Sequence, residues 1–295
     1  MNSVFENWDF SIIGNSHLSS NKVKQDYSYS KITKNKAVAI VADGHGSSRH
    51  IRSEKGAEIA VKCTVSALDD FVRNLNVNIF LCESKRNGLL RQLTDSIVYN
   101  WKEHILAEFN ENPLTDEEKE VLKKNYGDES LDQNRIERMY GTTLIAFIIT
   151  RTYAFGFQIG DGKAFIIKAT GELSQAIVDD EKCFLNTTTS LSDENAYEEF
   201  RYCYFDSKDV PICAFVSTDG IDKLYGDGEI LYNFYRTVFI ALSQNKKTDC
   251  VNELQELLKN LSPSSDDMSI SCLYNKKLIK NNPLVTESVG DVNET

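Results

Sequence analysis

The sequence predicts an α+β protein in which strands and helices occupy separate stretches of the chain. Short apolar runs typical of strands fill residues 10–50, helical spacing fills residues 53 to about 139, and strand-like runs return from Thr142. Two more helical stretches and a last strand follow before residue 275. This order differs from alternating βαβ units, and two antiparallel sheets with helices outside them would satisfy it.

The N-terminal half supplies the first strands and the first helices. The strand-like runs are DFSIIG, DYSYSKIT and KAVAIVAD, and the last contains the apolar run Ala37 to Ala42, as in a strand buried on both faces. Apolar residues recur at helical spacing from Glu58 to Val72 and from Leu89 to Trp101. The charged stretch from Thr115 to Arg138 opens with a capping box, T-D-E-E, and is typical of a solvated helical surface.

The second half predicts more strands, two helices and a tail. TLIAFIIT, YAFGFQIG, KAFIIKAT and GELSQAIV follow one another with short turns, which predicts an antiparallel meander. After an irregular stretch, residues 179–200, come RYCYFDS, ICAFVSTDG, helices over 231–242 and 251–261, and the strand MSISCLY. We therefore expect one domain over residues 1–275. Residues 276–295 are polar and lack periodicity, so we expect a disordered tail there.

Composition excludes several classes of partner. The 295 residues carry 44 acidic against 33 basic side chains, a net charge of −11, and no basic stripe. Nucleic-acid binding needs clustered Lys and Arg, and an acidic surface is repelled by anionic membranes, so we expect neither partner. The N-terminus lacks a basic segment followed by an apolar one, and the seven cysteines never form a C-x-x-C pair. These features favour a cytoplasmic location.

Aspartates stand at the ends of otherwise buried strands. Asp43 follows AIVA, Asp161 follows FGFQIG, Asp219 follows AFVST, and Asp266 and Asp267 precede MSISCLY. Carboxylates that converge on one cleft repel one another unless a cation lies among them. Oxygen ligands without His or Cys clusters favour Mg²⁺ or Mn²⁺ over zinc.

Each of these aspartates also has a purely structural interpretation. Asp-Gly is a strong hairpin signal, so Asp161-Gly162 is a turn whether or not it has another role. The D-G-H-G segment at 43–46 is equally compatible with a tight turn, in which His45 is a polar loop residue. Only the conjunction of the acids, in this order and at these strand ends, favours a functional site.

The motifs together resemble a known family. They are D-G-H-G (43–46), Y-G-T-T (140–143), Q-I-G-D-G (158–162), S-T-D-G (217–220) and S-D-D-M-S (265–269). In this set the chain is similar to the metal-dependent type 2C Ser/Thr protein phosphatases. S-I-I-G-N-S-H (11–17) and K-Q-D (24–26) resemble the domain start in a bacterial branch. The resemblance runs from about Phe10 to Tyr274 and implies a four-layer α–β–β–α sandwich.

The resemblance also implies a set of site residues. Asp43 would bridge two divalent ions, Mn²⁺ or Mg²⁺, and the carbonyl of Gly44 would bind one of them. Asp219 and Asp266 would complete the other ion's ligands, Asp161 would contribute to a third, looser position, and Asp26 would lie near the centre. A hydroxide bridging the two metals would attack phosphorus. His45 resembles the general acid that protonates the leaving serine or threonine oxygen, whereas the Gly141-Thr142-Thr143 turn would support the fold.

The implied activity is hydrolysis of phosphoserine and phosphothreonine in proteins, paired with a cognate Ser/Thr kinase. Two alternatives remain open: a catalytically silent module of the same fold that binds phosphoproteins, and a metal-dependent hydrolase of small phosphoesters. Retention of the metal-binding acids disfavours the silent module, and turnover on phosphopeptides and on small metabolites would separate the other two.

The chain departs from the family's pattern in the N-terminal segment. Many members have an arginine there that binds the substrate phosphate, but Gly14-Asn15-Ser16-His17 has none, which leaves His17, Lys22 or Lys24 as substitutes. Gln25 stands where many relatives have Glu, and Ser47 replaces a glycine. Residues 179–200 lie where the family carries a variable flap, so they either select substrate or form a polar surface excursion.

Overall fold

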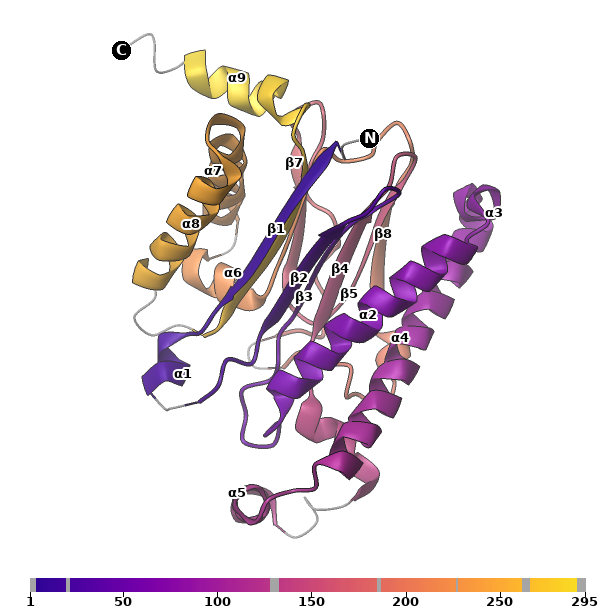
Figure 1. Cartoon of the computed structure of the whole chain (residues 1–295), viewed down its shortest axis with the longest axis vertical. Coiled ribbons are helices and arrows are strands. Elements are labelled where there is room, and N and C mark those ends of the chain that lie inside the picture. The colour runs from indigo at the N-terminus through magenta and orange to yellow at the C-terminus, as the bar shows by residue number, and fades with distance from the viewer. Residues whose placement is uncertain are drawn as a thin grey trace.

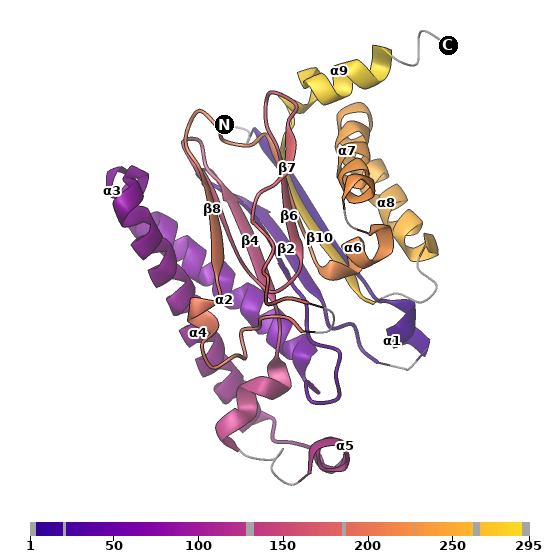
Figure 2. The ribbon, with the colours of Figure 1, turned by 180° about the vertical axis from the view of Figure 1, so that it is seen from behind.

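Four layers make up the molecule. The computed structural model describes residues 4–19, 22–127, 133–184, 187–226, 228–261 and 266–290. Two five-stranded sheets lie face to face, and helices cover both outer faces (Figure 1; Figure 2). The α–β–β–α sandwich implied by the sequence is therefore confirmed.

Both sheets are antiparallel throughout. The first sheet has the order β1-β10-β9-β6-β7, with β1 (Phe5–Ile12), β10 (Met268–Asn275), β9 (Cys213–Ser217), β6 (Lys163–Ile167) and β7 (Leu173–Gln175). The second has the order β2-β3-β4-β5-β8, with β2 (Tyr27–Ile32), β3 (Ala37–Ala42), β4 (Leu144–Ile149), β5 (Ala154–Ile159) and β8 (Arg201–Phe205).

Two helical layers cover the sheets. The layer on the second sheet contains α2 (Ser53–Asn74), α3 (Val77–Leu81), α4 (Glu83–Glu111), α5 (Asp116–Tyr126) and the 3-10 helix η2 (Gln133–Tyr140). The layer on the first sheet contains α7 (Glu229–Gln244) and α8 (Lys247–Leu261). Shorter elements are α1 (Asn15–Ser19), α6 (Asp219–Tyr225), η3 (Ala196–Glu198), η4 (Ile279–Asn281) and α9 (Pro283–Gly290). Within the described ranges, no helix has both the length and the apolar character needed to cross a bilayer.

Alternation along β3 shows how one strand serves two cores. Val38 and Ile40 pack against the α2–α4 layer, whereas Ala39 and Val41 pack against the opposite sheet. All six residues of the strand are buried, as the uninterrupted apolar run predicted. Small alanines on the inner face let the two sheets approach closely.

The predicted meander from Thr142 is wrong at one step, between β5 and β6. β4 and β5 pair with each other, but β6 pairs with β7 and β9 in the other sheet. The Asp161-Gly162 turn is therefore a crossing between sheets and not a hairpin. The Gln158 amide holds this crossing by donating to the carbonyls of Gly160 (3.1 Å) and Gly162 (2.6 Å). An apolar run such as β6 fits either sheet, so the sequence pattern does not identify its partner strand.

The expected disordered tail is also wrong for residues 276–290. Ile279 and Val285 are buried in the core beneath α7, with 1% and 6% of their surfaces exposed. The Asn282 amide donates to the carbonyl of Lys168 (3.0 Å), and Pro283 occupies the first position of α9, where its missing N–H costs nothing. Two anchors in a polar segment give no detectable period, which explains the failure. Residues 291–295 lie outside the described ranges.

Candidate active site

The strand ends that carry the aspartates lie together at one end of the sandwich. Ser217 lies opposite both Lys163 and Ile270, so the chain positions just beyond these strand ends are neighbours. Asp161 precedes β6, Asp219 follows β9, and Asp266 precedes β10. The second sheet contributes Asp43 immediately after β3. The antiparallel register therefore brings together acids that are far apart in the sequence.

Backbone hydrogen bonds fix the segment that carries Asp43. Its N–H donates to Thr143 Oγ1 (3.1 Å), and its carbonyl accepts from the Thr143 N–H (2.8 Å) and from Thr142 Oγ1 (2.9 Å). A Cβ on Gly44 would lie 2.7 Å from the carbonyl oxygens of Gln25 and Ser53, so no side chain fits there. The Gly141-Thr142-Thr143 turn thus supports the strand end, as expected.

The acids open onto a cleft of about 600 Å³. Its walls include the predicted site residues Asp43, His45, Asp161, Asp219 and Asp266. Asp26 lies beneath them with 3% of its surface exposed, and the Thr218 hydroxyl donates to its Oδ2 (2.7 Å). Five of the six residues predicted as metal ligands, all except Gly44, thus have carboxylates at one site.

The carboxylates destabilise one another's charged forms. Burial, followed by repulsion from Asp26, Asp219, Asp266 and Asp161, raises the pKa of Asp43 well above its usual range. Burial and the neighbouring Asp267 raise the pKa of Asp26 to about 8. Burial and Asp219 also raise the pKa of Asp161. A cation among these groups would reverse the penalty.

Unsatisfied oxygens point to the same conclusion. Oδ1 of Asp26 and Oδ1 of Asp219 are buried and accept no hydrogen bond from the described residues. An all-oxygen donor set with free lone pairs fits a hard divalent ion. As the side chains lie, however, no three Asp, Glu, His or Cys in the described ranges form a ready-made metal site. The residues fit such an ion in kind and in position, and binding would draw the carboxylates together.

Lys223 is a cleft residue that the sequence analysis did not single out. Its Nζ lies 2.7 Å from Asp219 Oδ2 and 3.0 Å from Asp266 Oδ2. Burial favours the neutral amine, but the two carboxylates outweigh burial and raise the pKa of Lys223. The i,i+4 spacing of Asp219 and Lys223 on a helix was the available signal.

Asp267, the second acid of the pair before β10, serves the N-terminal segment. Its carboxylate accepts from the N–H groups of Gly14 (2.7 Å) and Gln25 (2.5 Å), and His17 Nδ1 lies 3.0 Å away. His17 is thus engaged with Asp267 and is not among the residues that line the cleft. Its Nε2 lies 4.0 Å from Asp266 Oδ1, so the imidazole is held beside both acids that precede β10.

The other two proposed substitutes lie elsewhere. Lys24 lines a separate cavity with Lys259 and Met268. Lys22 donates to the carbonyl of Gly46 (3.1 Å) at the outside of the D-G-H-G loop. Neither residue is among those lining the cleft.

His45 lines the cleft, and its surroundings disfavour the protonated imidazole. Its backbone N–H donates to the carbonyl of Gly141 (3.0 Å), and its ring lies 4.8 Å from that of His50. Burial and the neighbouring His50 lower the pKa of His45 to about 3. The imidazole is therefore neutral near pH 7, and a negative charge beside it would be needed to retain a second proton.

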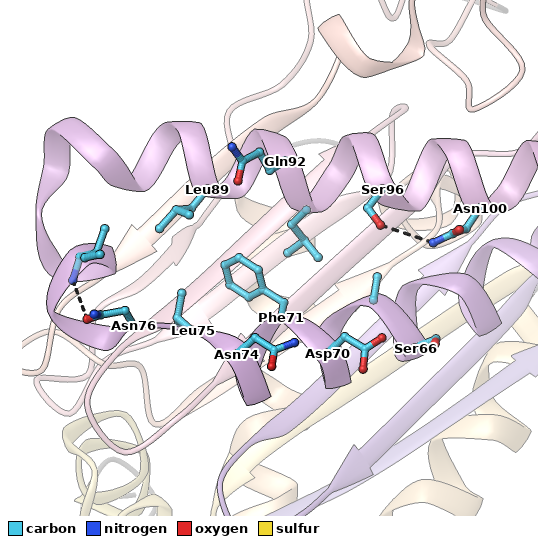
Figure 3. A pocket seen from close by; sticks show the side chains of 13 residues that line it. Ser66, Asp70, Phe71, Asn74, Leu75, Asn76, Leu89, Gln92, Ser96 and Asn100 are labelled. Carbon is cyan, nitrogen blue, oxygen red and sulfur yellow. Dashed lines mark hydrogen bonds between the residues drawn. The ribbon is translucent and has the colours of Figure 1, made fainter.

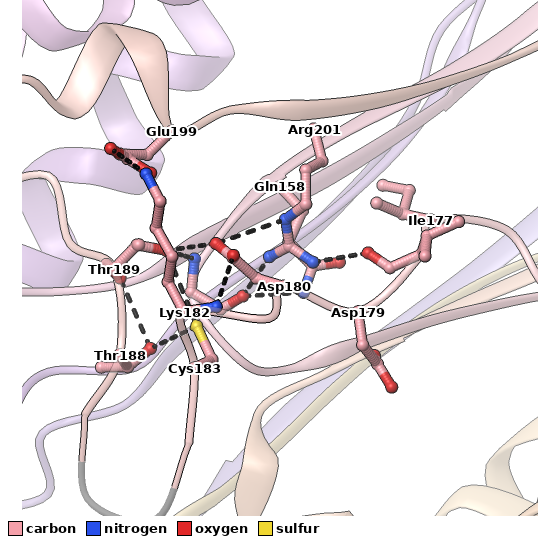
Figure 4. A network of polar contacts seen from close by, with 12 residues as sticks. Gln158, Ile177, Asp179, Asp180, Lys182, Cys183, Thr188, Thr189, Glu199 and Arg201 are labelled. Atoms are coloured by element: carbon pink, nitrogen blue, oxygen red, sulfur yellow. Dashed lines mark hydrogen bonds and ion pairs between the residues drawn. The ribbon is translucent and has the colours of Figure 1, made fainter.

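Segment 179–200 forms one wall of the cleft in its described parts. Arg201 donates to the carbonyl of Val178 (2.6 Å) and to that of Gly160, and the Gly160 N–H donates to Thr189 Oγ1 (3.0 Å). Figure 4 shows the polar network around Arg201, in which the Thr189 hydroxyl donates to Asp180 Oδ2 (3.3 Å). Thr188 and Ser190 face the cleft. The segment is thus anchored beside Asp161 and is not a detached surface loop.

A second hollow lies far from these acids. It is a groove of about 440 Å³ between α2 and α4, with Phe71, Leu75 and Leu89 along it (Figure 3). Asp70 is the one carboxylate among its described lining residues. The groove therefore lacks the converging acids that distinguish the cleft.

Comparison with known proteins agrees with this geometry. A family profile described as Protein phosphatase 2C matches residues 13–261. The chain belongs to this family of protein-serine/threonine phosphatases. The match includes Asp43, Asp161 and Asp219 and ends before Asp266, which the structure nonetheless brings to the same cleft.

Solved structures of low sequence identity share the fold. A bacterial serine phosphatase is 14% identical, with 92% of this chain and 98% of that chain covered and a TM-score of 0.56. Stp1 from Staphylococcus aureus is 14% identical, with 93% and 96% covered and a TM-score of 0.55. The catalytic domain of PstP, solved with two manganese ions, is 16% identical, with 92% and 97% covered and a TM-score of 0.53. No curated protein matches the chain.

Proposed function

We propose that this chain is an active, metal-dependent phosphatase that hydrolyses phosphoserine and phosphothreonine in proteins. The observation that carries the proposal is the convergence of Asp43, Asp161, Asp219 and Asp266 on one cleft, above the buried Asp26. The raised pKa values of Asp43 and Asp26, and the unpaired oxygens of Asp26 and Asp219, make the site unfavourable without a cation. The chain retains carboxylates that a silent module would have no reason to keep, which supports the active enzyme.

The residues that would hold two divalent ions, Mn²⁺ or Mg²⁺, are Asp43, the Gly44 carbonyl, Asp219 and Asp266. Asp161 would contribute to a third position, and Asp26 would support the centre from below. Bound ions of this kind supply a nucleophilic water at neutral pH and neutralise charge on phosphoryl oxygens. The fixed backbone around Asp43 would keep its carboxylate in place while the other carboxylates move toward the ions.

His45 would donate the proton that the leaving serine or threonine oxygen needs. Alone it is neutral, because burial and His50 hold its pKa at about 3. A phosphate dianion in the cleft would raise that pKa and load the ring with a proton only when substrate is present. The proton would then be available at the step that requires it.

Substrates would be phosphoproteins made by a cognate Ser/Thr kinase in the cytoplasm, and we expect neither nucleic acid nor a membrane as a partner. The segment 179–200 would contact the polypeptide around the phosphate, since Thr188 and Ser190 stand on the cleft wall. Deletion of residues 179–200 should change the ratio of activities on different phosphoproteins, and an unchanged ratio would refute this role.

The decisive experiment measures phosphate release from a phosphothreonine peptide with Mn²⁺, with Mg²⁺ and with EDTA. We expect turnover that EDTA and Asp219→Ala each abolish. Asp249→Ala removes an exposed carboxylate on α8 and is the matched control, which should retain full activity. No turnover by folded protein with either metal would contradict the proposal and favour the silent binding module. Faster turnover of small phosphoesters than of phosphopeptides would favour the third alternative.

A further inference from the structure

An internal cation bridges two of the carboxylates that would bind metal. The Lys223 ammonium lies 2.7 Å from Asp219 Oδ2 and 3.0 Å from Asp266 Oδ2. These contacts occupy one oxygen of each carboxylate, while Oδ1 of Asp219 is buried without a hydrogen bond from the described residues. A single positive charge thus stabilises the pair incompletely.

Of the described residues that line the cleft, Lys223 alone is a lysine or arginine. Among the histidines, His17 has its Nε2 4.0 Å from Asp266 Oδ1, farther than the Lys223 ammonium is from the same carboxylate, and its Nδ1 lies 3.0 Å from Asp267 Oδ1. The charge of Lys223 is therefore the local alternative to a metal ion.

The helix beneath Lys223 is firmly placed, although the ammonium itself can move. A Cβ on Gly220 would lie 2.0 Å from the Asp267 carbonyl oxygen, so the first turn of α6 is packed directly on the start of β10. The Lys223 side chain is 55% exposed and reaches the carboxylates through its flexible stem. The ammonium can leave the pair without any movement of the backbone.

We propose that Lys223 is a built-in competitor of the divalent ion bound by Asp219 and Asp266. In the metal-free protein its ammonium takes the ion's place, holds the two carboxylates and limits their mutual repulsion. An incoming ion must displace it, so the affinity of this metal position is lower than its ligands alone would give. The inference rests on the proposed function, because it assumes that Asp219 and Asp266 are metal ligands.

The test is calorimetric titration of the metal-free protein with Mn²⁺, using the full chain. Lys223→Met removes the charge and keeps the length of the stem, so the weaker of the two Mn²⁺ affinities should rise about tenfold or more. Lys22→Met is the matched control: it removes a lysine that donates to the Gly46 carbonyl (3.1 Å) and is not among the described residues that line the cleft, and it should leave both affinities unchanged.

Thermal unfolding provides a readout independent of activity. In EDTA, Lys223→Met should unfold at a lower temperature than the wild type, because the carboxylates have lost their counter-ion. In saturating Mn²⁺ the same variant should gain more stability than the wild type. A merely structural lysine would lower both melting temperatures and would leave Mn²⁺ affinity as it was.

The outcomes separate the inference from the proposed function. Equal Mn²⁺ affinities in the wild type and Lys223→Met, with Asp219→Asn weakening both, would overturn the competition and leave the metal centre intact. Absence of Mn²⁺ binding to either protein would overturn the metal centre and the inference with it. Mn²⁺ binding to Lys223→Met alone would support the competition in its strongest form.

Discussion

Two clusters of charged side chains flank the D-G-H-G loop, and they are satisfied to very different degrees. At the start of α2, the Arg52 guanidinium is 7% exposed, yet each of its five N–H groups has a partner. It donates to both oxygens of Glu118, to Tyr140 Oη and to two backbone carbonyls. In the cleft, by contrast, Asp26 and Asp219 each have a buried oxygen without a hydrogen bond from the described chain.

The difference distinguishes a structural charge from one arranged for a ligand. A buried ion is tolerated when all its hydrogen-bonding groups are paired, as those of Arg52 are, and it then ties helices together. Carboxylates that repel one another and leave oxygens unpaired are unfavourable for the fold by themselves, and a bound cation would relieve them. Substitutions in the two clusters should therefore affect stability in opposite directions.

The largest effect is expected at Arg52. Arg52→Met should lower the free energy of unfolding by about 3–5 kcal/mol, because Glu118, Tyr140 and two carbonyls lose their partner together. Urea unfolding would measure this. Arg49→Met removes an exposed guanidinium stacked on Tyr126 and should change stability by less than about 0.5 kcal/mol. A comparable loss of unfolding free energy in Arg52→Met and Arg49→Met would contradict the structural role of the Arg52 hydrogen bonds.

Asp43→Asn should instead lower the activity without lowering the stability. We expect phosphatase activity to fall by at least about 10²–10³-fold, since the amide removes a charged ligand and its electrostatic contribution. In EDTA the variant should be as stable as the wild type or more stable, because burial and four neighbouring acids already disfavour the Asp43 carboxylate. A strong loss of stability of Asp43→Asn in EDTA would contradict the proposed difference between the two clusters.

A smaller loss is expected for His45→Gln, about 10²-fold in kcat on a phosphothreonine peptide. With p-nitrophenyl phosphate, whose leaving group needs no proton, the loss should be much smaller. His104→Gln removes an exposed imidazole on α4 and should leave both rates unchanged. Equal losses of His45→Gln on the two substrates would exclude the general-acid role and indicate a positioning role.

The smallest effect is expected for Glu118→Gln, and it concerns how stability changes at acidic pH. Hydrogen bonding from Arg52, opposed in part by burial, lowers the pKa of Glu118 from 4.5. Its contribution is therefore complete above pH 4.5 and is lost as the pH falls through the lower folded-state pKa. Glu118→Gln should cost about 1–2 kcal/mol at pH 7 and progressively less in acid. A difference that stays constant from pH 7 to pH 3 would contradict this linkage.

Much of the fold was predictable because local patterns determine it. The capping box at Thr115 forms as predicted, with Thr115 Oγ1 accepting from the Glu118 N–H and the Glu118 carboxylate accepting from the Thr115 N–H. The β3 run is buried on both faces as expected. The predicted pairing of β6 with β5 failed because strand pairing depends on long-range register, which an apolar run does not encode.

The candidate site was predictable in its ligands and not in its counter-charge. Each aspartate could be recognised by its position at a strand end. The roles of Asp267 and Lys223 depend on groups that are remote in the sequence. The Asp267 carboxylate accepts from the backbone N–H groups of Gly14 and Gln25. The Lys223 ammonium forms an ion pair with Asp266, which precedes β10. The i,i+4 spacing on the helix indicates only the Lys223–Asp219 pair, whereas these contacts between remote elements follow from tertiary packing.

The central position of β10 has a consequence for when activity arises during synthesis. This strand, encoded near the end of the described chain, lies between β1 and β9, and the adjacent Asp267 accepts the Gly14 N–H across 253 residues of sequence. Contacts of such sequence separation form late and slowly. A nascent chain that still lacks residues 266–275 has neither the N-terminal anchor nor Asp266, so the cleft is assembled only when the last strand leaves the ribosome and closes the sheet.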